Sequence, residues 1–145
     1  MKLSVTTLLL AAVASLTFVA PVATAQDKDK EDPTPSFKKR LDSEKEFITK
    51  VGEATVKAVR TAPAKLELDS YKITDPKPNR KIIEIVMNWA GSVTGKKFKS
   101  TIKITVDPTD KEKWEVLDIE YNDDNPSLKV NLEKNLKNLR AKFNR

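Results

Sequence analysis

Residues 82–106 read IIEIVMNWAGSVTGKKFKSTIKITV, and this stretch contains the pattern that decides the fold. Apolar and polar residues alternate on both sides of Thr94-Gly95, as they do in strands with one covered face. A tight turn at Thr94-Gly95 predicts three aliphatic cross-strand pairs: Ile83 with Val106, Ile85 with Ile104 and Met87 with Ile102. We therefore expect an antiparallel hairpin that is buried on one face and polar on the other.

A strand is predicted before the hairpin, over residues 65–74. Its apolar residues change face partway along, and a β-bulge near Asp69-Ser70 would return them all to the covered face. The following stretch, residues 75–80, reads DPKPNR. Because proline cannot donate a hydrogen bond to a neighbouring strand, we expect this stretch to be a connection and not a strand.

Another strand is predicted after the hairpin, over residues 113–121. It shows the same change of face, which a bulge at Val116-Leu117 opposite Ile104 would repair. This arrangement predicts two further pairs, Trp114 with Val106 and Ile119 with Ile102. The four strands would then form an antiparallel meander.

An amphipathic helix is predicted before the strands, because apolar residues recur every three or four positions over residues 37–59. Two start signals compete, namely Thr34-Pro35 and the capping box Ser43-x-x-Glu46. The sequence leaves open whether one helix continues across Asp42-Ser43. Gly52 lies beside the apolar stripe and disfavours a helix, which predicts that another element approaches closely there.

A second amphipathic helix is predicted after the last strand. Asn125-Pro126 would begin it, and Asp123 and Asp124 would stabilise its positive end. Its apolar stripe consists of Leu128, Leu132, Leu136, Leu139 and Phe143. The expected fold is a single α+β domain over residues 36–145. It is a two-layer sandwich in which an N-terminal and a C-terminal helix cover one face of the sheet, in the order α-β-β-β-β-α.

The first 25 residues have the features of a signal peptide. Lys2 precedes an apolar run over residues 8–20, and the small residues before Gln26 fit a cleavage site after Ala25. An uncleaved N-terminal anchor is the alternative. Residues 26–35 are charged and proline-containing, and are expected to be a disordered leader. We therefore expect a secreted or periplasmic protein, and the absence of glycosylation acceptors favours a bacterial source.

Composition excludes several chemistries. The chain has no cysteine and no histidine, so it cannot contain a cysteine nucleophile, a Ser-His-Asp triad or a zinc site made of these residues. The whole chain carries 27 basic and 21 acidic residues, a net charge of +6. We expect no catalytic residue, metal or cofactor, and a moderately basic surface that favours anionic partners over nucleic acid or stable membrane insertion.

Two basic surfaces are candidates for binding an anionic partner. One is a row of lysines on the polar face of the sheet, and the other is the basic side of the last helix; together they comprise Lys97, Lys99, Lys103, Lys129, Lys137 and Arg140. The alternative is that cross-strand ion pairs and a solvated helix face keep the protein soluble. Ile82 and Val86 fall on the polar face and form a candidate partner patch.

The sequence favours a non-enzymatic binding or interaction module that meets an acidic envelope component or an acidic protein. A hydrolase that uses carboxylates alone is the alternative, with Glu84, Asp118 and Glu120 as candidates, and it requires that one of them be substantially buried. A structural subunit of an envelope assembly is a further possibility. The acidic loop at residues 122–125 is interpreted as a helix cap in preference to a calcium site, because it lacks the glycine turn.

Overall fold

The computed structural model of the protein describes residues 32–39 and 43–145. The chain divides into two units, Met1–Pro33 and Thr34–Arg145, and every helix and strand described below belongs to the second. The predicted signal peptide at 1–25 lies outside the described residues, as do the leader as far as residue 31 and Asp42 at the proposed helix break. Within the described part of the chain, no helix is long and apolar enough to cross a membrane.

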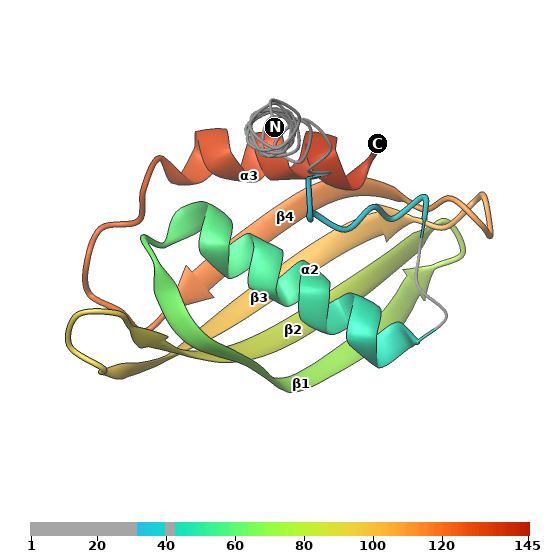
Figure 1. The fold of residues 1–145 in the computed structure, drawn as a ribbon. Coiled ribbons are helices and arrows are strands. Elements are labelled where there is room, and N and C mark those ends of the chain that lie inside the picture. The colour runs from blue at the N-terminus through green and yellow to red at the C-terminus, as the bar shows by residue number, and fades with distance from the viewer. Residues whose placement is uncertain (1–31, 40–42) are drawn as a thin grey trace, which may run out of the picture. The chain divides into compact units, whose positions relative to one another are not determined.

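The helices and strands follow one another in the predicted order. Along the chain they are α2 (Glu44–Val59), β1 (Pro63–Lys77), β2 (Arg80–Gly91), β3 (Lys97–Asp107), β4 (Glu115–Asp123) and α3 (Leu132–Phe143). The strands form one antiparallel sheet in the order β1-β2-β3-β4, and both helices lie against the same face of it (Figure 1). This arrangement confirms the predicted α+β meander.

The hairpin has the predicted faces but a different register. Ile83 pairs with Ile104, Ile85 with Ile102 and Met87 with Ser100, a slip of two residues from the predicted pairs. The slip arises because the turn is centred on Val93-Thr94, one residue earlier than expected; the pair nearest to it is Ala90 with Lys97. Gly91 N–H donates to Lys96 O (2.9 Å) and Gly95 N–H donates to Gly91 O (2.8 Å), with Gly95 in the left-handed region at a φ of 66°. A shift by two positions keeps every side chain on its face, so the buried set is unchanged.

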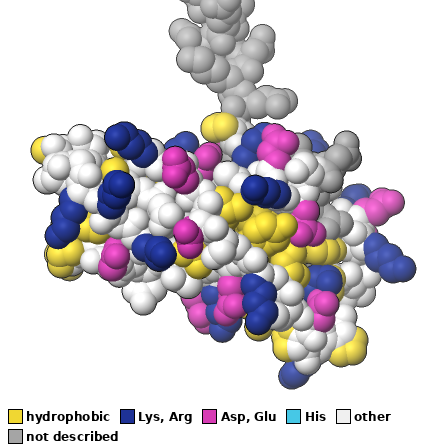
Figure 2. Space-filling view, turned by 90° about the horizontal axis from the view of Figure 1, so that it is seen from below, with side chains coloured by type: hydrophobic (Ala, Val, Ile, Leu, Met, Phe, Trp, Pro, Cys, Tyr) yellow, Lys and Arg dark blue, Asp and Glu magenta, His cyan; other side chains and the backbone are white. Residues whose placement is uncertain are grey.

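The bulge predicted in the first strand is present, but the strand is longer than predicted. Leu68 pairs with Met87 and Ser70 with Val86, which leaves Asp69 as the extra residue. The four apolar side chains of this strand all pack against the core: Leu66, Leu68, Tyr71 and Ile73. A view from the β1 side shows hydrophobic side chains gathered in the middle, with acidic and basic side chains around them (Figure 2).

The prediction that residues 75–80 cannot form a strand is wrong. β1 continues through Pro76 to Lys77, which pairs with Arg80 across a two-residue turn. Proline is tolerated because β1 is an edge strand, where the missing N–H need not meet a neighbour.

The bulge in β4 is also present, at Leu117, between the pairs Val106–Val116 and Thr105–Asp118. The predicted partners are wrong by the same two-residue slip as in the hairpin. Ile119 pairs with Ile104, and Trp114 precedes the strand.

The start of α2 follows the second of the two competing signals. Ser43 is the N-cap, and its hydroxyl accepts a hydrogen bond from Glu46 N–H (3.4 Å). The segment that contains Thr34-Pro35 is not helical. Phe37 is nevertheless buried, with its ring 5.0 Å from that of Phe47 and 5.4 Å from that of Phe143.

The last helix begins later than predicted, at Leu132 and not at Asn125-Pro126, and residues 124–131 form a non-helical segment. Leu139 and Phe143 are buried and Leu132 and Leu136 partly so, whereas Leu128 is 95% exposed. At the far end of this helix the Asn144 side chain pairs with the outer edge of β4. Its Oδ1 accepts from Val116 N–H (2.7 Å) and its Nδ2 donates to Val116 O (2.9 Å).

The close approach predicted at Gly52 is confirmed. A Cβ atom at this position would lie 2.5 Å from the Met87 Sδ atom and 3.2 Å from Ile85 Cγ2, so α2 presses directly on β2. Both neighbours are fully buried and have little freedom to move.

Replacing Gly52 with alanine should therefore lower the free energy of unfolding by about 1–3 kcal/mol, because overpacking outweighs the roughly 1 kcal/mol that alanine gains in a helix. In a Met87→Ala background the new methyl group has room, and the same substitution should become neutral or stabilising. Urea denaturation of the four proteins measures both effects. Equal destabilisation in the two backgrounds would contradict a steric origin.

Candidate functional site

One end of the sheet, on the left in Figure 1, gathers three connections that are far apart in the sequence. They are residues 60–62 between α2 and β1, residues 92–96 between β2 and β3, and residues 124–131 between β4 and α3. We call this region the loop end. Its conformation depends on a group of buried polar side chains that lie on the helix-covered side of the sheet.

Arg60 and Asp123 form a buried ion pair at the centre of the loop end. Arg60 directly follows α2, and Asp123 is the last residue of β4. The Arg60 Nε atom donates to Asp123 Oδ2 (2.7 Å) and its Nη2 donates to Oδ1 (2.5 Å), so the contact is bidentate. The side chains are 5% and 0% exposed. This geometry is the strong form of an arginine–carboxylate pair.

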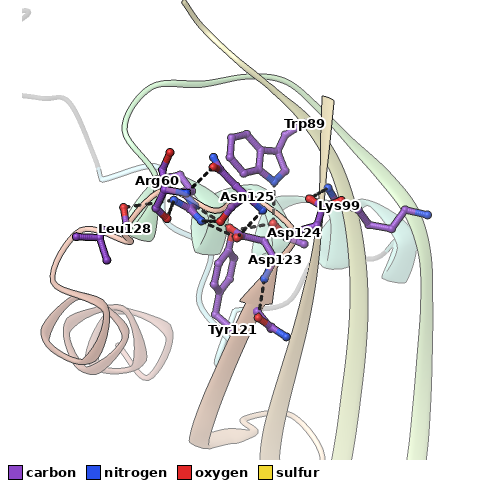
Figure 3. Close-up of polar contacts among 11 residues, drawn as sticks. Arg60, Trp89, Lys99, Tyr121, Asp123, Asp124, Asn125 and Leu128 are labelled. Carbon is purple, nitrogen blue, oxygen red and sulfur yellow. Dashed lines mark hydrogen bonds and ion pairs between the residues drawn. The ribbon is translucent and has the colours of Figure 1, made fainter. Parts of the chain in front are cut away.

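The remaining hydrogen bonds of Arg60 hold the segment that was predicted to be helical. Nη1 donates to Ser127 O (2.8 Å) and Leu128 O (3.3 Å), and Nη2 donates to Asn125 O (3.1 Å) (Figure 3). These carbonyl groups would have to accept from N–H groups further along the chain if a helix began at Asn125. Because they turn towards Arg60, the helix is delayed. The interpretation of Asp123 as a helix cap is therefore wrong.

A chain of hydrogen bonds continues from Asp123 into the sheet. The Tyr121 hydroxyl donates to Asp123 Oδ2 (2.7 Å) and lies 2.7 Å from the Ser100 hydroxyl, which accepts from Trp89 Nε1 (2.7 Å). Because a phenol has one proton and Tyr121 gives it to Asp123, Ser100 must donate to Tyr121. The chain thus runs from Trp89 through Ser100 and Tyr121 to Asp123, and each step has a defined direction.

Burial and hydrogen bonding set the charges in this network. Burial raises the pKa of the Tyr121 phenol, and the Asp123 carboxylate raises it further. Burial alone would raise the pKa of Asp123, but hydrogen bonds from Arg60 and Tyr121 outweigh it, so that pKa is lowered. The hydrogen bond to Asp123 raises the pKa of Arg60. Near neutral pH the network therefore holds one ion pair and one neutral phenol.

Trp89 connects the buried network to the surface. Its ring lies 4.8 Å from that of Phe98 with an angle of 38° between the planes, and the Arg60 guanidinium lies 5.8 Å from its centre. A groove borders these two aromatic residues on each side. The first, of about 480 Å³, we call the lysine groove; besides the two aromatic rings it is lined by Lys65, Glu67, Asn88, Ala90, Lys97, Lys99 and Asp124.

The second groove, of about 400 Å³, we call the loop groove. It lies between residues 91–96 and residues 125–128, with Arg60, Thr61, Trp89 and Phe98 on its inner side. Val93 and Leu128 border it from opposite connections, and their side chains are 96% and 95% exposed.

The lysines at the loop end differ in their partners. Lys99 Nζ lies 3.7 Å from Asp69 Oδ2, and its backbone N–H donates to Asp124 Oδ1 (2.9 Å). In contrast, Lys65, Lys96 and Lys97 form no ion pair with any described residue. Lys65 sits in a bulge of β1 with a positive φ of 52°, and Lys96 Nζ lies 5.8 Å from the centre of the Phe98 ring.

The structure distributes the predicted basic surface over three places. Lys97, Lys99 and Lys129 belong to the loop end or adjoin it. Lys103 lies in the middle of the sheet and pairs with Glu120 (3.6 Å). The third place is a separate groove of about 330 Å³ between β4 and α3, where the Arg140 side chain donates to Leu117 O (2.8 Å). It is lined by Asp118, Ile119, Glu133, Leu136, Lys137 and Arg140.

The other predicted candidates lie on the sheet away from the loop end. Ile82 and Val86 are half-buried in β2. Glu84, Asp118 and Glu120 are all exposed, so none of them provides the buried carboxylate that a carboxylate-only hydrolase needs. Among the described residues there is no group of three or more Asp, Glu, His or Cys side chains that could hold a metal ion.

The sequence did not predict that Arg60, Asp123 and Trp89 belong to one site. A signal for Asp123 was present, because the alternation of Ile119 and Tyr121 in the last strand continues to it and places it on the covered face. A carboxylate on a covered face requires a cationic partner. Nothing in the sequence names Arg60 as that partner, since 63 residues separate them.

Comparison of the chain with protein-family models, with curated proteins and with solved structures finds no match. The loop end combines two grooves, an aromatic pair that lines both and charged side chains around them.

Replacing Arg60 with methionine should lower the free energy of unfolding by about 3–5 kcal/mol, because it leaves the Asp123 carboxylate buried without a counter-charge. Adding Asp123→Asn removes that charge, so the double variant should be more stable than Arg60→Met alone. Urea denaturation of the two single variants and the double variant tests this. If the double variant loses as much unfolding free energy as the two single variants lose together, the two side chains do not interact, and the ion pair is contradicted.

Acid should weaken the same interaction. A carboxyl group whose pKa is lowered by folding contributes stability above its unfolded pKa of about 3.9, and that contribution is lost as the pH falls through the folded pKa. The stability difference between the wild-type protein and Asp123→Asn should therefore shrink below about pH 4. The pKa of the Asp107 carboxyl is also lowered, by hydrogen bonds from Thr109. Because Asp107 titrates in both proteins, its contribution cancels in the difference between their stabilities. A difference that stays constant in acid would contradict the assignment.

Proposed function

We propose that the protein is a non-enzymatic binding module that recognises an anionic partner at the loop end. The observation that carries this proposal is the lysine groove, in which Lys65 and Lys97 stand beside the Trp89–Phe98 pair. Aromatic side chains beside a few placed charged groups are typical of a binding site, and here three of the five charged lining residues are lysines. The groove lies where the lysine row of the open sheet face reaches the loop end, and its larger size favours binding there over the groove on α3.

The charges at the loop end favour a negative partner. Lys65, Lys96 and Lys97 form no ion pair with a described residue, whereas Lys99 and Lys103 each lie near a carboxylate. Lysines outside close ion pairs contribute to the local potential, and in the lysine groove Lys65, Lys97 and Lys99 outnumber the carboxylates of Glu67 and Asp124. All three lysine side chains would attract the carboxylate or phosphate groups of a partner.

The rigidity of the site also supports binding. The Arg60 hydrogen bonds fix residues 125–128, and the bond from Trp89 to Ser100 fixes the indole ring. A partner therefore meets a surface that is ordered before binding, which reduces the loss of conformational entropy on association.

The buried ionisable groups support a binding role over a catalytic one. Perturbed pKa values are common in active sites, but ion pairs that stabilise a fold perturb them as well. The Asp123 carboxylate accepts from Arg60, Tyr121 and Asn125, and the Tyr121 hydroxyl bonds both Ser100 and Asp123. These groups are occupied by each other and hold the loop end in place.

We propose further that the protein acts outside the cytoplasm. This rests on the signal-peptide features of residues 1–25, including the small residues before Gln26. Acidic polymers and acidic lipid head groups are the anionic partners that an exported protein would meet in an envelope.

Binding of poly-L-glutamate tests the proposal. In a Trp114→Phe background, Trp89 is the remaining tryptophan, so its fluorescence reports on the aromatic pair. The Lys65→Gln/Lys97→Gln variant should bind at least about fivefold more weakly, equivalent to about 1 kcal/mol, and wild-type binding should weaken as salt is added.

The matched control is Lys134→Gln/Lys137→Gln, which removes the same charge from α3 and should leave the affinity nearly unchanged. If the α3 variant loses affinity and the Lys65/Lys97 variant does not, the site is on the helix and the proposal is wrong. No binding of the polymer and no binding of anionic lipid vesicles at low ionic strength would also overturn it.

A further inference from the structure

We infer that the anionic partner is the surface of a phospholipid bilayer, with Val93 and Leu128 as the side chains that enter it; this inference rests on the proposed function. The two residues occupy separate connections at the loop end and border the same groove. The bilayer would be contacted by these connections, with the sheet and helices standing above it.

The clustering of exposed aliphatic side chains is the first observation. Within the described residues, the exposed large hydrophobic side chains are Val93, Leu128 and Val130, at 96%, 95% and 45% exposure, and all three belong to the loop end. Single exposed apolar residues are common on the surfaces of soluble proteins, but a cluster in one place indicates an interaction site.

The exposure of these side chains is imposed by the fold. The Leu128 carbonyl oxygen faces Arg60 (Figure 3), which anchors the main chain on the inner side. Val93 lies in the hairpin loop that Gly91 and Lys96 close. Arg60 thus holds the main chain at Leu128, and the loop's own main-chain hydrogen bonds hold it around Val93, so the fold keeps both side chains at the surface.

Lysines surround the aliphatic side chains. Lys96 borders the loop groove together with Val93 and Leu128, Lys97 follows Lys96 in the chain, and Lys129 follows Leu128. At the end on the left in both views, hydrophobic side chains reach the surface beside Lys and Arg side chains (Figure 2). Aliphatic residues among lysines are the two signals that together give stable but reversible attachment to anionic lipid.

A bilayer fits these features better than an acidic protein does. Val93 and Leu128 are almost fully exposed on two separate connections and do not form one flat apolar face. A protein partner would need a matching pocket for each, whereas hydrocarbon accepts protruding aliphatic groups without shape complementarity. An acidic polypeptide remains the competing outcome, and poly-L-glutamate represents it in the test.

The absence of cysteine from the chain permits a site-specific experiment. Val93→Cys, Leu128→Cys and Val86→Cys are each made in the full chain and labelled with NBD, a dye whose emission moves to the blue in an apolar environment. The labelled proteins are mixed with vesicles of phosphatidylglycerol or of phosphatidylcholine. Since residues 8–20 are themselves apolar, comparison of positions within one chain separates the loop end from the N-terminus.

We expect a blue shift at positions 93 and 128 with phosphatidylglycerol, little shift with phosphatidylcholine, and none at position 86 on the open sheet face. The unlabelled Val93→Ser/Leu128→Ser variant should bind phosphatidylglycerol vesicles about tenfold more weakly. The control Ile82→Thr/Val86→Thr should bind as the wild-type protein does. Thermal melting of each variant confirms folding, and the two exposed positions should not affect it.

Four results would overturn the inference. A shift at position 86 without a shift at positions 93 and 128 would place lipid on the sheet face. Vesicle binding that survives Val93→Ser/Leu128→Ser unchanged would exclude insertion by these residues. Binding of poly-L-glutamate without binding of vesicles would assign the site to an acidic chain and leave the proposed function intact, whereas binding of neither would overturn both.

Discussion

The ion pair between Arg60 and Asp123 joins the end of α2 to the end of β4 and fixes the loop that follows. Five hydrogen bonds from one guanidinium group satisfy a carboxylate and three main-chain carbonyl groups. A buried pair of this kind stabilises a fold less than a hydrophobic pair would, but it is costly to break and highly directional. Its value here is geometric, because it determines which main-chain groups face inward and which side chains therefore face the solvent.

The sequence was sufficient to predict the architecture because side-chain alternation survives errors of register. The hairpin slipped by two residues, yet Ile83, Ile85 and Met87 remained on the covered face. Both bulges could be predicted, since one extra residue in a strand is what shifts the phase of an alternating apolar pattern. The exact partners depended on where the turn is centred, and the local sequence around Thr94-Gly95 did not show that the centre lies one residue earlier, at Val93-Thr94.

The candidate site was harder to predict because its decisive contacts are long-range. The Asn125-Pro126 pair is a reasonable helix start by local rules, and the leucines after it have helical spacing. What delays the helix is an arginine more than 60 residues earlier, which takes the carbonyl groups of Asn125, Ser127 and Leu128. Tertiary interactions of this kind override local propensity. Lys65 and Lys97 meet in one groove for the same reason, since the order of the strands brings their ends together.

The Asn144 amide, which pairs with both backbone groups of Val116, has a consequence for the solubility of the sheet. A β-sheet with an open border can add strands from other molecules and grow into an aggregate. At the β4 border one side chain occupies the place that the next strand would take, while β1, at the opposite border, is interrupted by proline and three register shifts. Neither border offers a long, regular template, so the molecule can expose apolar groups at its loop end without also inviting polymerisation through its strands.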